Sequence, residues 1–544
     1  MFLMLNENHG KTQLTKVVFS ENARRELFSG LSITAEAVMC TLGPKGKTVL
    51  IQKDDDIPII TKDGVTVSKS IKLKDPLKRM GSELIREAAN RTNDIAGDGT
   101  TTSTVLTHAM VKSGLKLLEA GYSAQDLCFG IEIATKQILL YLQETAKQLT
   151  TVEEIAQIGT ISANGDRNIG DLIARAMEKV GRDGVITVED AKGMSTSLEF
   201  VEGMQFDRGY LSPYFVTNSE KMNIVFQDAK ILLTDKKISS LKELIPILEK
   251  TMQNRMPLLI IAEDIEGEAL QGLVLNKLNA NLHVVAIKAP GFGKYKEELL
   301  SDIAALSGAK LVSNSTGLKL ELLTLEDLGS LKKVVVDAKS STLVANGTTK
   351  HVIDERINEL KFQMQDMANT TEDVAKLKTR VAKLSSGVAV IKVGGATELE
   401  MTERKYRIED ALNATKAAAD EGIVPGGGMA LFYAASSLID TENLSSQIKA
   451  GVSIVADACL APLRRIVHNA GGNGDVVINE LKRLDSIKTK IGYNAATGVY
   501  EDLVMMGVID PVKVTKTALK NAASVATTFL NLDAVIVEDD TSAT

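Results

Sequence analysis

The feature that most constrains this chain is a glycine-acid-glycine turn that opens directly into a helix. Residues Ala96–Thr102 form the turn, and a helical pattern follows to an expected stop at Gly121. Two glycines let the backbone approach a ligand closely, and the unpaired N–H groups of a helix start attract an anion. The threonines at this start supply hydroxyl groups and a cap.

The acid between the two glycines, Asp98, would by itself repel a phosphate. Hard divalent cations bind carboxylate and phosphate oxygens together, so a cation between them removes the conflict. The turn therefore predicts a nucleotide site in which Asp98 binds Mg²⁺. Taken alone, the same residues fit a glycine turn that caps an ordinary helix equally well.

Composition describes a globular protein of several domains. The chain has 544 residues, of which 44% are hydrophobic and 24% charged. Its net charge of −7 and its lack of dense Lys/Arg clusters argue against nucleic acid as a partner. No apolar run is long enough to cross a bilayer, and the first residues do not resemble a signal or transit peptide, so we expect a cytoplasmic protein without membrane contact. The cysteines Cys40, Cys128 and Cys459 lie outside any metal-ligand spacing and are expected to be small core residues.

Hydrophobic patterning divides the chain into helical, mixed and again helical parts. Residues 20–148 are mainly helical, except for two expected short strands, Lys47–Gln52 and Pro58–Thr61, around a turn at 53–56. After Ala411 the helical pattern returns. The order indicates a mixed segment inserted into a helical whole.

Within the mixed part, about 184–392, strands and helices alternate. Leu258–Ala262 and His283–Ile287 are predicted to be buried parallel strands with helices between them, and 334–336 is a further apolar run. A charged helical hairpin is expected over about 351–384, packed on the domain beside it.

Further motifs accompany the glycine turn in a fixed order. They are Thr41–Gly46, Ile60–Val67, Val424–Gly428, Gly492–Thr497 and Val508–Pro511. This ordered set resembles the group I chaperonins (the GroEL family), which are ATP-driven protein-folding machines. The resemblance extends from about Lys16 to about Val537 and covers nearly the whole chain.

The resemblance implies a three-domain fold that combines α and α/β parts. A helical equatorial domain that binds ATP would comprise residues 1–144 and 421–544, and a small intermediate domain 145–201 and 389–420. An α/β apical domain, 202–388, would be inserted between them. Members of the family form rings of seven subunits, one or two rings to an assembly.

The resemblance also assigns residues to the nucleotide. Thr41 to Pro44 would wrap the phosphates and the base side, Lys62 would lie near the phosphates with a K⁺ ion held through its backbone, and Asp98 would bind Mg²⁺. The complete set is Thr41, Leu42, Gly43, Pro44, Lys62, Asp98, Gly99, Thr100, Thr101, Thr102, Gly427, Asn494, Ala495, Ala496 and Asp510. In that set, Asp510 would hold the ribose hydroxyls.

Hydrolysis needs an oriented water as well as charge stabilisation. The family's catalytic aspartate matches Asp410, and Asp63 is a second carboxylate expected near the water. Without the resemblance, Asp410 would be interpreted as an exposed helix acid. Domain closure is expected to bring it to the nucleotide. The family's switching salt bridges match Arg208, Glu398, Asp166 and Arg407.

An apolar surface for unfolded clients is expected on the apical domain. From the sequence alone, the leucines and valine of 270–278 would be core, since they lie on one broad helix face. The resemblance instead places eight residues at the mouth of the ring cavity: Tyr210, Tyr214, Phe215, Ile245, Leu248, Leu270, Val274 and Leu275. A lid-like co-chaperonin would bind the same surface.

Three departures distinguish the chain from the family pattern. Residues Lys294–Lys296 replace an acidic-basic run, the usual Gly-Gly-Met tail is missing, and about ten residues precede the usual start. These differences fit a divergent paralogue or a virus-encoded member. Alternatives to a folding ATPase are a ring-forming scaffold protein that does not cycle and, with less support, a metabolic kinase.

Overall fold

The computed structural model describes residues 15–538 with short gaps. The gaps are 53–57, 150, 164, 182–183, 192, 219–221, 280–281, 314–315, 365–370, 386 and 439–443. The expected turn at 53–56 and the N-terminal extension therefore lie outside the described residues. The chain divides into two compact units, which we call the first unit (residues up to 174 and from 402) and the second unit (175–401).

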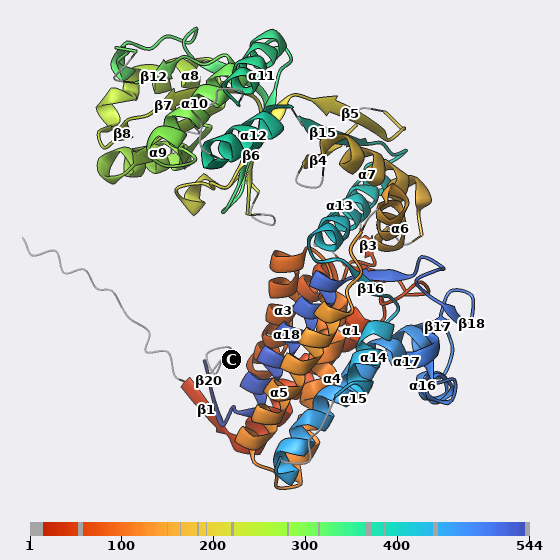
Figure 1. The fold of residues 1–544 in the computed structure, drawn as a ribbon. Helices are drawn as coiled ribbons and strands as arrows, with labels where there is room; N and C mark the ends of the chain where they lie inside the picture. The colour runs from red at the N-terminus through yellow and green to blue at the C-terminus, as the bar shows by residue number, and fades with distance from the viewer. Residues whose placement is uncertain are drawn as a thin grey trace, which may run out of the picture. The chain divides into compact units, whose positions relative to one another are not determined.

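The first unit is a helical bundle in which the two halves of the chain interleave (Figure 1). Its central helices lie side by side: α1 (Ser20–Met39), α3 (Pro76–Ala96), α4 (Thr100–Glu119), α5 (Ala124–Glu144), α15 (Ser446–Asn469) and α18 (Val512–Leu530). The smaller helices are α2 (Gly64–Ser70), α6 (Val152–Ser162), α14 (Met429–Ser436), α16 (Gly474–Arg483) and α17 (Ser486–Thr489). Helices α7 (Arg167–Val180) and α13 (Glu398–Glu421) each contain a boundary between the units.

Local sequence signals explain where the bundle helices begin and end. Asp75 caps α3, Pro76 occupies its first turn, and Gly97 ends it in a left-handed conformation. Helix α4 ends before Gly121, as predicted. Helices α1 and α3 pack backbone against backbone, because a Cβ on Gly30 would lie 1.9 Å from the Lys78 carbonyl oxygen.

The first unit also contains short antiparallel strand pairs. They are β1 (Thr15–Phe19) with β20 (Ala534–Glu538), β2 (Val49–Ile51) with β3 (Ile59–Thr61), β16 (Ile423–Pro425) with β19 (Ile509–Pro511), and β17 (Ile491–Asn494) with β18 (Val499–Asp502). The predicted strand pair around residues 53–56 is therefore confirmed.

The second unit is built on a seven-stranded mixed sheet. The strand order is β11 (Val284–Lys288), β9 (Leu258–Ala262), β7 (Ile224–Thr234), β13 (Gly329–Val336), β14 (Ser341–Ala345) and β6 (Gly203–Phe206), with β12 (Leu311–Val312) paired to β7. Strands β7, β9 and β11 are parallel, which confirms the two predicted buried strands. Every side chain of β9 is buried, because helices cover this part of the sheet.

The remaining elements of the second unit surround this sheet. The helices are α8 (Ile245–Gln253), α9 (Gly267–Asn279), α10 (Gly293–Ser307), α11 (Lys350–Met364) and α12 (Thr371–Ser385), and the 3₁₀ turns are η1 (Pro213–Phe215), η2 (Leu241–Glu243) and η3 (Leu320–Leu322). A small parallel pair joins β8 (Lys237–Ile238) to β10 (Asp264–Ile265), and a three-stranded sheet contains β4 (Val185–Asp190), β15 (Val388–Val393) and β5 (Ser197–Val201).

The α and α/β fold class agrees with the sequence analysis. Helices α11 and α12 form the predicted hairpin over 351–384. The two compact units do not separate an intermediate domain, so the boundaries at 145–201 and 389–420 stay a prediction. Within the described residues, no helix is both long enough and apolar enough to span a bilayer.

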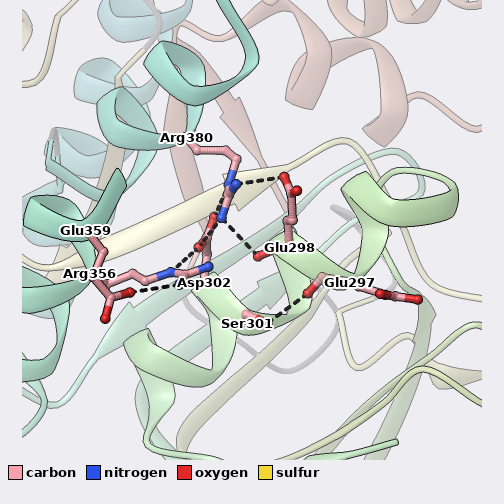
Figure 2. A network of polar contacts seen from close by, with 7 residues as sticks. All are labelled: Glu297, Glu298, Ser301, Asp302, Arg356, Glu359 and Arg380. Atoms are coloured by element: carbon pink, nitrogen blue, oxygen red, sulfur yellow. Dashed lines mark hydrogen bonds and ion pairs between the residues drawn. The ribbon is translucent and has the colours of Figure 1, made fainter. Parts of the chain in front are cut away.

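A buried network of ion pairs links the α11–α12 hairpin to α10 (Figure 2). The Asp302 carboxylate on α10 is fully buried and accepts two hydrogen bonds from Arg380 of α12, at 2.7 and 2.8 Å. Arg356 of α11 donates a third, at 2.9 Å. Arg380 also donates to Glu298, and Arg356 to Glu359. One carboxylate therefore joins three helices.

Removal of Asp302 should strongly destabilise the second unit. Asp302→Ala would leave two guanidinium groups without their shared carboxylate, and Arg380 is only 1% exposed, so we expect a loss of about 3–5 kcal/mol. Glu266→Ala, which removes an exposed ion pair with Lys237, should leave the free energy of unfolding almost unchanged, because solvent screens the pair. Urea unfolding of both variants measures the difference, and equal effects would contradict the importance of the network.

Candidate nucleotide site

The turn before α4 can be built only from glycine at two positions. Gly97 and Gly99 have φ values of 73° and 87°, in the left-handed region. A Cβ on Gly97 would lie 2.5 Å from the Cβ of Asn413, and one on Gly99 would lie 2.6 Å from Val514. Helices α13 and α18, both from the C-terminal half of the chain, therefore pack closely against the turn. Asp98 lies between the two glycines at which they make contact.

The start of α4 is open to a ligand. Gly99 is its N-cap, and among the described residues no side chain caps this end. The N–H groups of the first turn therefore keep their capacity to donate to an anion. Thr100 is buried, whereas Thr101 and Thr102 keep part of their surface exposed.

A second turn, before α2, lies directly against this helix start. A Cβ on Gly64 would be 2.5 Å from Oγ1 of Thr101 and 3.2 Å from Oγ1 of Thr100. Asp63 caps α2: its carboxylate accepts hydrogen bonds from the N–H groups of Val65 and Thr66, at 3.1 and 2.9 Å. The carboxylate expected near the water thus also has a structural role.

The pair β16–β19 brings a third acid to the site. Asp510 lies opposite Val424 in this pair, and a Cβ on Gly426 would be 3.1 Å from its Oδ1. Burial, and secondly the negative charge of Asp98, raise the pKa of Asp510 to about 7. The residues around 426 and 510, far apart in the sequence, therefore form one wall beside Asp98.

Asp98 is the electrostatic centre of this arrangement. Burial raises the pKa of its carboxyl group above the usual value, and the charge of Asp63 raises it further. Hydrogen bonds from the Gly99 N–H and from the Ser162 hydroxyl act in the opposite direction. Ser162, the last residue of α6, was not singled out by sequence reasoning, because no local motif marks a contact between segments this far apart.

The donor set suits Mg²⁺ only when a nucleotide is also present. No cluster of three or more His, Cys, Asp or Glu side chains placed to hold a metal occurs among the described residues. Mg²⁺ usually binds one or two carboxylates together with substrate phosphates and water. A single half-buried acid at a helix N-terminus that no described side chain caps fits this mode, and the cation would relieve the repulsion of Asp98 by Asp63 and by Asp510.

The loop Thr41–Pro44 is held in place by α15. Asn469 donates through its side-chain amide to the carbonyl oxygens of Met39 and Leu42, at 3.0 and 2.9 Å. Gly43 has a φ of 88°, and a Cβ there would contact Ile466 of the same helix. One turn away on α15, Leu463 lies against Gly428. Helix α15 therefore connects this loop to the glycine loop 426–428.

The β17–β18 hairpin carries Asn494, Ala495 and Ala496, which the resemblance assigns to the nucleotide. Asn494 donates to Glu501 at 2.8 Å and accepts from the N–H of Ala496 at 3.0 Å, so its amide fixes the turn. Asn494 and Ala495 are buried, whereas Ala496 is exposed, as are Pro44 and Lys62. A Cβ added to Gly427 would lie 3.7 Å from the side chain of Leu503. The same leucine side chain also packs against Gly492.

Helix α13 meets the Asp98 turn close to Asp410. Asn413 donates to the Gly97 carbonyl oxygen at 3.4 Å, and Asp410 lies one turn earlier on the same helix. Arg407, a further turn back, has an ion pair with Asp166 at 4.0 Å, and both residues are among the four matched to family switches. In the second unit, the guanidinium of Arg208 instead stacks 5.1 Å from the ring centre of Phe292.

The structure divides the eight expected client-surface residues into three groups. Tyr214, Ile245 and Leu275 are 64%, 40% and 56% exposed. Tyr210, Leu270 and Val274 are half-buried and pack against the core.

Phe215 and Leu248 do not belong to this surface in the structure. Phe215 is fully buried because it anchors η1 in the core of the second unit. Leu248 is only 7% exposed because it lies with Ile247 on the inner face of α8. Their assignment to an exposed surface is corrected accordingly.

The raised pKa of Asp510 makes stability depend on pH. Native Asp510 keeps a proton up to about pH 7, whereas the unfolded chain releases it near 3.8. The free energy of unfolding of the nucleotide-free protein should therefore fall as the pH rises from about 4 to about 7. Asp510→Asn should reduce this slope. The free energy of unfolding that Asp510 contributes to the change between these pH values is at most about 4 kcal/mol.

The measurement is urea unfolding of the first unit at several pH values between these limits. Asp457→Asn, at an exposed acid on α15, is the matched control and should keep the wild-type slope. An unchanged slope in Asp510→Asn would contradict the electrostatic coupling described here.

Comparison with known proteins places this fold and site in one family. Residues 34–540 match the TCP-1/cpn60 chaperonin family. Two crystal structures of the chaperonin gp146 from the bacteriophage EL 2 (Pseudomonas aeruginosa), in the presence of ATP-BeFx, have similar folds. Crystal form II aligns with a TM-score of 0.66 and 22% identity, and form I with 0.62 and 21%; each alignment covers 96% of this chain and 99% of that one. The match over nearly the whole length, together with the fold, shows that the chain belongs to the TCP-1/cpn60 chaperonin family.

Proposed function

We propose that the protein is an ATP-driven chaperonin that binds non-native proteins and promotes their folding within a ring. The observation that carries the proposal is the half-buried Asp98 between two obligatory glycines, at the N-terminus of α4, which no side chain in the described part of the chain caps. Such a turn accommodates phosphate and a divalent cation together. Membership of the chaperonin family and the ATP-BeFx present with the phage chaperonin agree with it.

In this proposal different parts of the site bind different parts of the nucleotide and its cations. The first-turn N–H groups and hydroxyls of Thr100, Thr101 and Thr102 bind the phosphates. Asp98 would hold Mg²⁺, which neutralises charge on the transferring phosphoryl group when it is bound. The hairpin at 494–496, with Gly427 and Asp510, binds the adenosine end, while the backbone near Lys62 would hold K⁺.

Asp410 orients the attacking water in this proposal. Its helix already contacts the Asp98 turn through Asn413, so a small movement of α13 would change the distance between Asp410 and the phosphate. Hydrolysis would then depend on the position of this helix. The Asp63 carboxylate, fixed as the cap of α2, supports the same region from the other side.

The exposed apolar residues of the second unit would bind clients. Tyr214, Leu275 and Ile245 remain in the proposed surface, and Leu278 on α9, 55% exposed, extends it. Apolar surface of this kind binds unfolded chains without reading their sequence. A lid-like co-chaperonin would compete for it and close the chamber.

Assembly would use the strand pairs of the first unit. Leu50 on β2 and Ile60 on β3 are 67% and 52% exposed, and Phe19 on β1 and Ile536 on β20 are 62% and 64% exposed. Two-stranded sheets with exposed apolar side chains are marginal alone and gain stability when another chain adds strands. These edges support subunit contacts in a ring of seven, single or double.

Replacement of Asp410 should separate binding from hydrolysis. Asp410→Ala is expected to slow steady-state ATP turnover by about a hundredfold, because the water loses its orienting base. ATP affinity should stay within about threefold of wild type, since the phosphate contacts remain. Asp457→Ala, at an exposed acid on α15, is the control. Normal turnover in Asp410→Ala would refute the assigned role.

A charge on the exposed strand edge should break the assembly. Leu50→Asp would place a carboxylate in the proposed subunit contact, so mass photometry should show monomers in place of the wild-type assembly. Leu140→Asp, at a 61% exposed leucine on α5, provides a matched control and should leave assembly intact. Intact assemblies of Leu50→Asp would exclude β2 from the interface.

A further inference from the structure

The client surface includes a short segment that crosses the edge of the large sheet. Leu211 donates its N–H to the Ala286 carbonyl oxygen of β11 at 2.9 Å, and η1 follows at once. Phe215 is fully buried, whereas its neighbour Tyr214 is 64% exposed. The segment is therefore anchored on one side and presents an aromatic ring on the other.

A lysine on α9 fixes the end of this segment. The Lys277 ammonium group donates a part-buried hydrogen bond to the Val216 carbonyl oxygen, with an Nζ–O distance of 3.1 Å. Lys277 lies between Leu275 and Leu278, two exposed apolar residues of the same helix. This contact is local to the second unit and spans 61 residues of sequence.

The contact runs against the usual behaviour of lysine. A lysine on a surface helix normally extends its ammonium group into water and pays entropy when it is immobilised. Here the group is directed to one backbone carbonyl, and hydrogen bonds from charged donors are stronger than neutral ones. The interaction therefore restrains Val216, and through the tight turn Pro213–Val216 it restrains Tyr214.

The neighbouring helix repeats the arrangement. Lys250 on α8 donates to the Leu323 carbonyl oxygen at 2.9 Å. Leu323 follows η3, in which Leu322 is 75% exposed. On both helices a lysine therefore holds the backbone beside a strongly exposed apolar side chain.

We propose that Lys277 is a positioning residue for client binding, which holds η1 so that Tyr214 stays beside the exposed leucines of α9. The inference rests on the proposed client-binding function of this surface. Lys277 does not itself supply apolar contact. It keeps Tyr214, Leu275 and Leu278 in one continuous apolar area, which lowers the entropy lost when a client binds.

A double-mutant cycle tests this role. The probe is a fluorescently labelled, permanently unfolded protein with its disulfides reduced and blocked, titrated into the intact assembly. Lys277→Ala and Tyr214→Ala should each weaken binding by about tenfold, whereas Lys277→Arg, which keeps a charged donor, should remain within about twofold. In the Tyr214→Ala background, Lys277→Ala should have no further effect.

Two further measurements make the outcome specific. Lys242→Ala removes an exposed lysine of η2 in the same unit and should leave binding unchanged, which controls for net charge. Hydrogen exchange without client should become faster at the N–H groups of Phe215 and Val216 in Lys277→Ala only. Independent, additive losses from Lys277→Ala and Tyr214→Ala, or equal losses from the Ala and Arg variants, would overturn the proposal.

The same experiments distinguish the inference from the function on which it rests. If the wild-type protein does not bind the unfolded probe, the client-binding function fails and the role of Lys277 in it fails too. Faster exchange in Lys277→Ala would then still establish the structural restraint. If wild type binds but exchange and affinity are unchanged in Lys277→Ala, only the role of Lys277 is refuted.

Discussion

The first unit depends on one unfavourable interaction, the placement of the half-buried Asp98 carboxylate near other acids. Close packing on Gly97 and Gly99 restricts the turn that carries Asp98. Burial raises the pKa values of Asp98 and Asp510; the charge of Asp63 raises that of Asp98 further, and the charge of Asp98 raises that of Asp510 further. A site of this kind has a strong preference for a cation bound together with an anionic ligand.

This constraint also connects distant parts of the chain. Helix α13 touches Gly97 through Asn413, α18 touches Gly99 through Val514, and α6 reaches Asp98 through Ser162. A ligand at Asp98 would therefore bind beside three helices. In our proposal the helix that carries Asp410 is among them, which relates nucleotide binding to the hydrolytic step.

Local patterns predicted those elements whose residues interact with near neighbours. The strands β9 and β11, the β2–β3 pair, the end of α4 and the α11–α12 hairpin follow from apolar runs, turns and glycine stops. The family resemblance places Leu248 and Phe215 on an exposed surface, but it does not determine which way each side chain points in this chain. Leu248 faces the core from α8, and Phe215 points inward while its neighbour Tyr214 points outward.

Contacts that join distant segments gave no sequence signal. The Asp302 network and the contact of Ser162 with Asp98 depend on how whole helices pack. The nucleotide residues were identified through ordered motifs that resemble a family. The structure brings Asp63, Asp98, Asp510 and the α4 start together, but the roles assigned to them remain predictions.

The central claim is that the Asp98 site hydrolyses ATP within a ring assembly. Its most direct test is steady-state ATP turnover by the purified protein as Mg²⁺ is titrated, with mass photometry of the same sample with and without ATP. We expect turnover that requires Mg²⁺ and is associated with a large assembly. An assembly that binds nucleotide but never turns it over, or a monomer that lacks activity at every Mg²⁺ concentration, would contradict it and favour a ring-forming scaffold or another class of protein.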